Sequence, residues 1–164
     1  MTAAEWPAKG LPPGMTIIVR PEGTDVARLL EESDLPTSDL TPEKLGNFLA
    51  CERAGRLEAI AGLELYGADG LLRSVVVAPQ WRSRGLGAAL VAHAEEAARA
   101  GGVARLFLLT DTAERFFGRL GYQRMEREAA PPAIRNTSEF SALCPASAVL
   151  MVKRLCDPAS DPPA

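Results

Sequence analysis

The amino-acid sequence predicts one α/β domain built around a mixed sheet. The chain has 164 residues, a length that suits a single domain with one apolar core. Segments with the pattern of strands alternate with segments of helical periodicity along the chain. Residues 71–78 are apolar on both faces apart from Arg73 and Ser74, which is typical of a strand at the centre of a sheet. We expect the domain to occupy residues 15–155, between flexible tails at 1–14 and 156–164.

The sequence of the first half of the chain predicts one strand, then two helices, then two further strands. Thr24 or Asp25 is a suitable cap for the first helix, which places Val26, Leu29 and Leu30 on its apolar side. Ala54-Gly55 predicts a tight hairpin turn. The expected elements are a strand at 15–20, a helix from the cap to about residue 31, a short helix within 33–45, and strands at 47–53 and 57–66.

The second half predicts a longer helix and further strands. The helix begins at Gly85 and is stopped by Gly101-Gly102. A shorter helix, capped by Asp111 or Thr112, ends before Gly121. The expected elements are a strand at 71–78, the two helices at 85–100 and 113–120, strands at 104–110, 122–128 and 147–155, and a helix starting near residue 132.

The composition is that of an ordinary soluble protein and excludes several classes. A net charge of −3 argues against non-specific nucleic-acid binding. The apolar run 71–79 is too short to cross a membrane, and no signal peptide opens the chain. Cys51, Cys144 and Cys156 are scattered, which fits neither a disulfide framework nor a metal site. We therefore expect a cytoplasmic protein without metal, nucleic-acid or membrane partners.

The segment after the central strand carries the pattern Arg82-x-x-Gly85-x-Gly87 and then an apolar helix. A dinucleotide fingerprint would need a third glycine at Leu90, and a Walker loop would need a Lys-Ser/Thr pair. Glycines let backbone N–H groups close around an anion, and the helix N-terminus adds unsatisfied donors. The alternative is a tight strand-to-helix corner without a ligand. The whole arrangement predicts a pyrophosphate cradle.

Two motifs resemble those of the GNAT N-acyltransferase superfamily. The run Val77-Ala78-Pro79-Gln80-Trp81-Arg82-Ser83-Arg84-Gly85-Leu86-Gly87 is similar to its acetyl-CoA signature, and TDTAERFFGRLGY at 110–122 is similar to its later block. The resemblance covers roughly residues 15–155. It implies a mixed, mostly antiparallel sheet of about seven strands, splayed at its centre and flanked by helices.

The resemblance also implies acetyl-CoA as cosubstrate and direct transfer of the acetyl group to the amine of a small molecule. Backbone groups of the central strand would pair with the pantetheine arm, and N–H groups of the glycine loop would hold the pyrophosphate. The cofactor-binding residues that it implies are Val75, Val76, Val77, Arg82, Ser83, Arg84, Gly85, Leu86, Gly87, Ala88, Thr110, Ala113, Phe116 and Phe117.

The chain departs from the family where protons are transferred. Phe117 stands where the family frequently has an acid tyrosine, Thr110 replaces the block asparagine, and Leu71 and Leu72 stand where a base is often found. Glu64 and Tyr66 are the catalytic candidates by position, with Asp111 a further one. A carboxylate near a strand also has the simpler interpretation of a surface group.

Arg73 has two interpretations, because a buried strand arginine is costly unless it is paired. It forms an ion pair with Glu64 or Asp69, or it grips an oxyanion of the substrate. The segment 131–148 is an addition to a minimal acyltransferase. Its Ile134, Phe140 and Leu143 would pack inward, and its Arg135 either pairs with Glu139 at i,i+4 or binds substrate in a lid or wall.

The chain further resembles the acetyltransferases of arsenic-resistance operons, the ArsN group, through LLRSVVV, the later block and AIRNTSEFSALCPASA. This implies a glutamate-like organoarsenical or phosphinic amino acid as acceptor, held by Arg73 and Arg135. The alternatives are a CoA-binding regulator without turnover and a protein N-terminal or lysine acetyltransferase. His93 is interpreted as a packed helix residue and Cys144 as a buried filler. Whether the chain forms a homodimer stays open.

Overall fold

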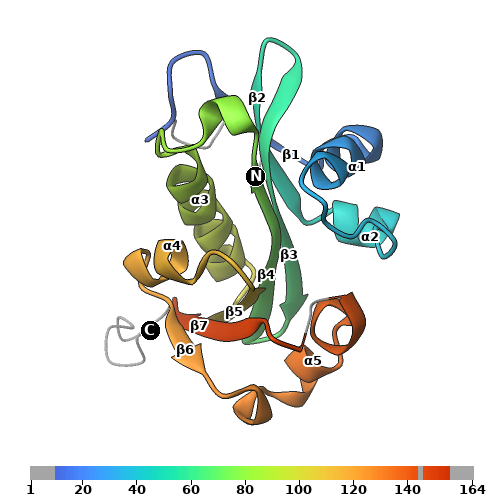
Figure 1. Cartoon of the computed structure of the whole chain (residues 1–164), viewed down its shortest axis with the longest axis vertical. Coiled ribbons are helices and arrows are strands. Elements are labelled where there is room, and N and C mark those ends of the chain that lie inside the picture. Colours follow the sequence, from blue (N-terminus) through green and yellow to red (C-terminus); the bar gives the residue numbers. More distant parts are fainter. Residues whose placement is uncertain (1–9, 144–145, 156–164) are drawn as a thin grey trace. The chain divides into compact units, whose positions relative to one another are not determined.

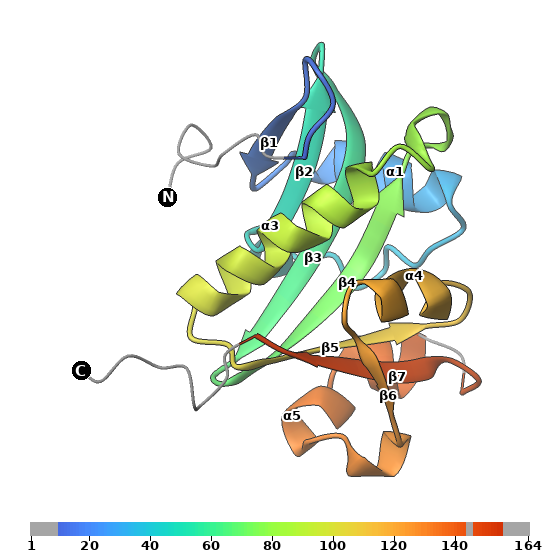
Figure 2. The same cartoon turned by 90° about the vertical axis from the view of Figure 1, so that its left-hand side faces the viewer.

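The computed structural model describes residues 10–143 and 146–155. Seven strands in this part of the chain form one sheet in the order β1-β2-β3-β4-β5-β7-β6, and helices flank it (Figures 1 and 2). Within the described residues, the chain divides into a first unit, 10–63 with 74–94, and a second unit, 64–73 with 95–143 and 146–155. The predicted α/β class with a mixed sheet is confirmed.

The first unit contains three antiparallel strands, of which the first two are connected through two helices and the last two by a tight turn. Ala54 and Gly55 have φ angles of 53° and 78°, which is the left-handed pair that a tight hairpin turn requires. The pairing of the second and third strands shifts by a bulge between Cys51 and Glu52. The elements are β1 (Thr16–Val19), α1 (Gly23–Glu32), α2 (Pro42–Leu45), β2 (Phe48–Arg53) and β3 (Arg56–Tyr66).

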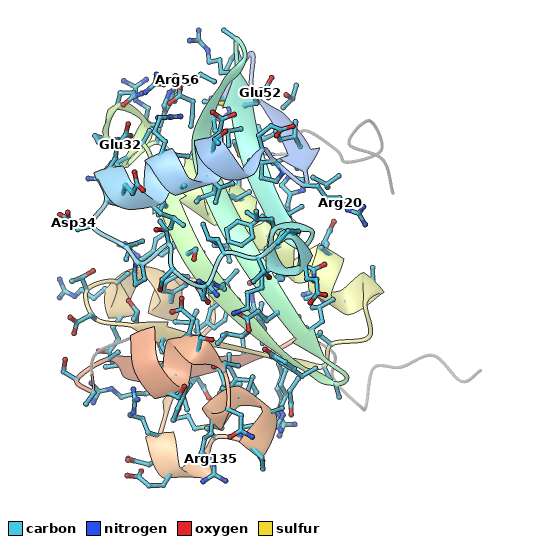
Figure 3. All side chains as sticks on the ribbon, turned by 90° about the vertical axis from the view of Figure 1, so that its right-hand side faces the viewer. Arg20, Glu32, Asp34, Glu52, Arg56 and Arg135 are labelled. Carbon is cyan, nitrogen blue, oxygen red and sulfur yellow. The ribbon has the colours of Figure 1, made fainter. Side chains whose placement is uncertain are left out.

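Helix α1 covers one face of β2 and β3, as Figure 3 shows. Its predicted apolar side is confirmed, because Val26, Leu29 and Leu30 are fully buried. The predicted caps are wrong: α1 begins at Gly23, so both candidates lie inside its first turn, and Glu22 occupies the cap without a side-chain hydrogen bond. Together with α2, this helix closes the apolar core of the first unit over Phe48, Ile60 and their neighbours.

The second unit is built on a parallel pair and two antiparallel pairs. Asp69–Leu71 of β4 (Asp69–Val77) run parallel to Arg105–Phe107 of β5 (Arg105–Thr110). β5 and β6 (Gln123–Met125) each pair antiparallel with β7 (Val149–Arg154). The helices of this unit are α4 (Glu114–Arg119) and α5 (Pro132–Arg135). Its core contains Leu71, Phe107, Ala130, Ile134 and Leu150.

Two predictions in the second unit need correction. The strand expected at 122–128 ends at Met125, because residues 127–129 form a 3-10 turn, η3 (Arg127–Ala129). The caps expected for α4 are also wrong. Ala113 occupies the cap position, and its N–H donates to the hydroxyl of Thr110, 2.9 Å away. Thr110 therefore closes the start of this short helix from the end of β5.

Helix α3 (Leu86–Ala100) contributes residues to both units and is ended by Gly101-Gly102, where Gly102 has a φ of 89°. His93 is 5% exposed, which confirms its interpretation as a packed helix residue. Cys51 is fully buried, whereas Cys144 and Cys156 lie outside the described residues. Within residues 10–143 and 146–155, no helix has the length and hydropathy needed to cross a membrane.

Candidate functional site

The predicted cradle lies in the first unit, between the end of β4 and the start of α3. A 3-10 turn, η2 (Pro79–Trp81), follows the strand, and Ser83 and Gly85 then adopt left-handed φ angles of 63° and 81°. A side chain at Gly85 would meet no atom within 4 Å, so glycine is needed there for its conformation and not for space.

The loop delivers free backbone donors to the first turn of α3. The carbonyl of Gly85 accepts the N–H of Ala89, 3.1 Å away, which is the first hydrogen bond of the helix. The N–H groups of residues 86–88 precede that bond, so they have no partner within the helix. Three backbone donors and the positive end of a 15-residue helix therefore meet at this turn, which suits a phosphate oxygen.

The cradle loop is anchored to the strands of its own unit. The side-chain amide of Gln80 donates to a carboxylate oxygen of Glu58, 2.9 Å away, and Glu58 is 7% exposed. The Nε of Arg82 donates to the carbonyl of Val77 at 3.0 Å. This hydrogen bond fixes the loop to the end of β4. Sequence reasoning missed Gln80 and Glu58, because nothing in the motif marks a buried carboxylate on a neighbouring strand.

Trp81 organises two arginines beside the cradle. The guanidinium carbon of Arg84 lies 5.3 Å from the centre of the indole, and that of Arg53 lies 5.4 Å from it. Arg84 belongs to the predicted motif, whereas Arg53 comes from the end of β2 and was not predicted. Both arginines are exposed, and Trp81 is half-buried.

The second unit holds the residues of the later block. Phe117 is 6% exposed, and its ring makes edge contacts with Phe116 and Tyr122 at centroid distances of 5.0 Å and 5.6 Å. The hydroxyl of Tyr122 donates to Glu95, which also accepts from Lys153 at 2.9 Å. Burial, followed by the Glu95 charge and hydrogen bond, raises the pKa of Tyr122. Phe117 thus belongs to a packed aromatic cluster.

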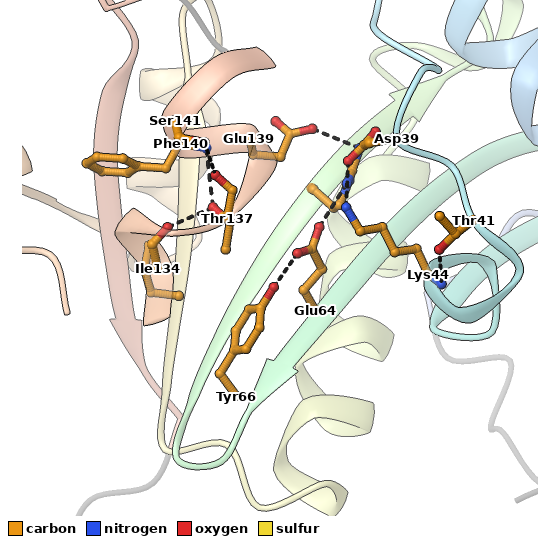
Figure 4. Close-up of polar contacts among 11 residues, drawn as sticks. Asp39, Thr41, Lys44, Glu64, Tyr66, Ile134, Thr137, Glu139, Phe140 and Ser141 are labelled. Carbon is orange, nitrogen blue, oxygen red and sulfur yellow. Dashed lines mark hydrogen bonds and ion pairs between the residues drawn. The ribbon is translucent and has the colours of Figure 1, made fainter. Parts of the chain in front are cut away.

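The second unit also contains a charge cluster around Arg73, whose partners Glu64 and Glu139 are labelled in Figure 4. Its guanidinium donates to Glu64 at 2.8 Å and pairs with Glu139 at 2.9 Å. The side chains of Arg73 and Glu64 are 1% and 6% exposed. Two carboxylates thus surround one guanidinium in a setting where charges are strongly coupled.

Tyr66 connects this cluster to the surface. Its hydroxyl donates to the second carboxylate oxygen of Glu64 at 2.5 Å, as Figure 4 shows. Tyr66 is 39% exposed, whereas Glu64 is buried. Burial raises the pKa of the Tyr66 hydroxyl, and the hydrogen bond and charge of Glu64 add to the effect. Tyr66 therefore stays protonated at neutral pH. The two catalytic candidates predicted from position are in direct contact.

Arg73 forms the ion pair that one of its two interpretations predicted. Glu64 is its partner, as one prediction had it, whereas Asp69 pairs with Arg105 at 2.9 Å. The predicted pair of Arg135 with Glu139 is wrong. Helix α5 ends at Arg135, so the helical spacing is lost, and Glu139 turns to Arg73 instead. Arg135 is exposed at the end of α5 (Figure 3).

The added segment is packed and internally bonded. Thr137 donates to the carbonyl of Ile134 at 2.7 Å and accepts from the N–H of Phe140 at 3.2 Å. Arg127 lies over the Phe140 ring at 4.5 Å and donates to the carbonyl of Ala148 at 3.0 Å. Ile134 is fully buried and Phe140 half-buried, which confirms that both pack inward. These bonds hold the π-helical turn η4 (Glu139–Leu143) that carries Glu139.

Over the ranges 10–143 and 146–155, no group of three or more His, Cys, Asp or Glu side chains is arranged to hold a metal ion.

Comparisons of the sequence and of the structure with known proteins both find acetyltransferases. A family model described as an acetyltransferase (GNAT) domain matches residues 44–124. An uncharacterised N-acetyltransferase of Chlorobaculum tepidum is 29% identical over 115 residues, which cover 69% of this chain and 74% of the relative.

Solved structures share the fold. N-acetylglutamate synthase from Neisseria gonorrhoeae, complexed with coenzyme A and N-acetyl-glutamate, is 24% identical over 87% of this chain, with a TM-score of 0.74. The chain spans only 35% of that synthase. A Mycobacterium tuberculosis protein complexed with CoA and NLQ is 21% identical over 86% of this chain and 99% of its own, with a TM-score of 0.70. At these identities the likeness establishes the fold.

Proposed function

We propose that this chain, which matches a model described as an acetyltransferase (GNAT) domain over residues 44–124 and shares the fold of GNAT structures, is an acetyl-CoA-dependent N-acetyltransferase of small amines. The observation that carries the proposal is the cradle: left-handed Ser83 and Gly85 lead into the first turn of α3, where three backbone N–H groups precede the first helical bond. Such a turn suits the pyrophosphate of coenzyme A.

The remaining contacts to coenzyme A follow the motif. Val75, Val76 and Val77 offer backbone groups to the pantetheine arm, directly after Ser74, whose left-handed φ of 55° interrupts the regular strand. The loop residues from Arg82 to Ala88 hold the phosphates. In the second unit, we assign contacts with the cosubstrate to Thr110, Ala113, Phe116 and Phe117. The cosubstrate supplies an activated thioester.

We assign proton transfer to Tyr66 and Glu64. The attacking amine must lose a proton as its nitrogen bonds to the acetyl carbon, and the thioester C–S bond then breaks, so that coenzyme A leaves as a thiolate and takes up a proton from water. Both Glu64 oxygens already accept hydrogen bonds, one from Arg73 and one from Tyr66. Tyr66 is therefore the group that a substrate meets. The ammonium proton passes to the Tyr66 oxygen while the Tyr66 hydroxyl proton passes to Glu64, so the relay begins and ends with a neutral tyrosine.

Arg73 is a positioning residue in this proposal. Its two carboxylate partners, Glu64 and Glu139, occupy the directions in which a substrate carboxylate would bind. The pairing holds the Glu64 carboxylate in the position from which it accepts the hydrogen bond of Tyr66. Of the two predicted substrate arginines, Arg135 is thus the one whose guanidinium is exposed.

For the acceptor we propose a small amino acid of glutamate-like shape, including the organoarsenical and phosphinic analogues implied by the resemblance to the ArsN group. The Neisseria synthase complex that contains N-acetyl-glutamate supports this class by analogy of fold. The exposed Arg135 offers a cation to a distal oxyanion.

A thiol-release assay with acetyl-CoA tests the proposal. The panel contains glutamate, a phosphinic and an arsinic glutamate analogue, neutral amines, and peptides with a free N-terminus or a lysine. We expect thiol release with the anionic amino acids. Release only with peptides would favour protein acetylation. Binding of coenzyme A without release from any acceptor would favour the CoA-binding regulator.

A further inference from the structure

We propose that Arg53 and Arg84, both held over the Trp81 indole, form a binding site for the 3′-phosphate of coenzyme A. The inference rests on the proposed function, because it concerns a second anionic group of the same cosubstrate. It adds two residues, Arg53 and Trp81, that lie outside the glycine motif's backbone contacts.

The first argument is the geometry of the two cations. Their guanidinium carbons lie 5.4 Å and 5.3 Å from the centre of one ring. Trp81 thus brings together two like charges from different places in the chain, the end of β2 and the cradle loop. The indole ring attracts each guanidinium through a cation–π interaction, whereas the two positive charges repel each other. A dianion between or beside them would remove that repulsion.

The second argument is that the guanidinium groups of Arg53 and Arg84 can bind an anion. In the stretches that the structure describes, neither Arg53 nor Arg84 forms an ion pair with a carboxylate. Both are exposed, and the Arg53 Nε lies 3.5 Å from the position that a Cβ would take at Gly14. Arg82 differs from them, because its Nε is bonded to the carbonyl of Val77.

The third argument is the chemistry of the ligand. Coenzyme A carries its pyrophosphate and a separate phosphomonoester on the two sides of one ribose. The cradle provides backbone donors for the pyrophosphate, and Arg84 belongs to the same loop. The phosphomonoester is close to doubly charged at neutral pH, and arginine forks bind such groups bidentately. The indole restricts both side chains and lowers the entropy lost on binding.

Calorimetry with coenzyme A and 3′-dephospho-coenzyme A tests the inference, since the two ligands differ only in this phosphate. For the unmodified protein we expect coenzyme A to bind about tenfold or more tightly than the dephospho form, as one charge-assisted contact provides. Arg53→Ala and Arg84→Ala should each reduce this ratio to about three or less, and Trp81→Leu should reduce it as well.

Arg56→Ala is the matched control. Arg56 is an exposed arginine of the same β2–β3 hairpin (Figure 3), and its removal changes the net charge equally. The ratio should stay at the value of the unmodified protein. Equal binding of both ligands to the unmodified protein would overturn the inference, as would an equal loss of preference in Arg56→Ala, which indicates a general surface field. If neither ligand binds, the proposed function itself fails.

Discussion

Arg73 donates to Glu64 across 2.8 Å, and the two side chains are 1% and 6% exposed. The pair lies at the point where the added segment reaches the strands, because Glu139 binds the same guanidinium. We therefore expect the contact to stabilise the second unit and also to orient Glu64, which belongs to the proposed proton relay.

Removing the guanidinium should be strongly destabilising. Arg73→Ala would remove the guanidinium that the buried Glu64 and the partly buried Glu139 both bind, and we expect a loss of about 3–5 kcal/mol in the free energy of unfolding. Arg73→Lys should recover part of it, since it keeps the charge but not the fork. Urea unfolding measures both. Arg135→Ala, an exposed arginine of the same unit, should stay within about 0.5 kcal/mol. A loss below about 1 kcal/mol for Arg73→Ala would show that the pair is not needed.

Glu139 should act locally on the added segment. Glu139→Ala removes the bond between η4 and Arg73 but leaves the Arg73–Glu64 pair in place. Hydrogen exchange of the amides at 137–143 should become about tenfold or more faster, while exchange in β5 and β7 stays unchanged. Uniform acceleration of all amides would instead indicate a global effect, and no change would show that Thr137 and Arg127 hold the segment alone.

Tyr66→Phe should separate catalysis from cosubstrate binding. Loss of the relay hydroxyl should lower kcat about a hundredfold, the usual size of a general acid–base contribution, and leave the KM for acetyl-CoA within about threefold. Tyr122→Phe provides the control, because its hydroxyl binds Glu95 and takes no part in the relay. A kcat that is unaffected by Tyr66→Phe would remove Tyr66 from the mechanism.

The two tyrosines of the chain should both resist ionisation. Burial and a neighbouring glutamate raise each pKa above the ordinary value of 10.0. The folded protein then binds more protons than the unfolded chain above pH 10, so stability is complete below that pH and falls as the pH rises further. Phenolate absorbance should appear only together with the loss of circular dichroism. Absorbance rising near pH 10 in the folded protein would contradict this.

Local patterns made most of the fold, and the turn that leads into α3, predictable. Ala54-Gly55 and the Arg82-x-x-Gly85-x-Gly87 run specify their turns through residues that are adjacent in sequence, and both were predicted at the correct place. The register of α1 was equally readable from the spacing of its apolar residues.

The partners of the charged residues could not be predicted in the same way. Glu139 is four residues from Arg135, and helical spacing favoured that pair. The helix ends too early for it, and a residue distant in sequence, Arg73, is the partner. Arg53 reaches Trp81 from another strand. Such contacts depend on how the elements pack, which no local motif records.

Binding of coenzyme A to Gly87→Glu measures the central claim most directly. The change places a carboxylate in the first turn of α3, where we propose that the backbone donors bind the pyrophosphate. Ala92→Glu, at an exposed position of the same helix, adds the same charge away from the cradle. By calorimetry we predict that Gly87→Glu weakens binding at least tenfold, about 1.4 kcal/mol, while Ala92→Glu stays within about twofold of the unmodified protein. Unchanged affinity in a folded Gly87→Glu protein would contradict the account.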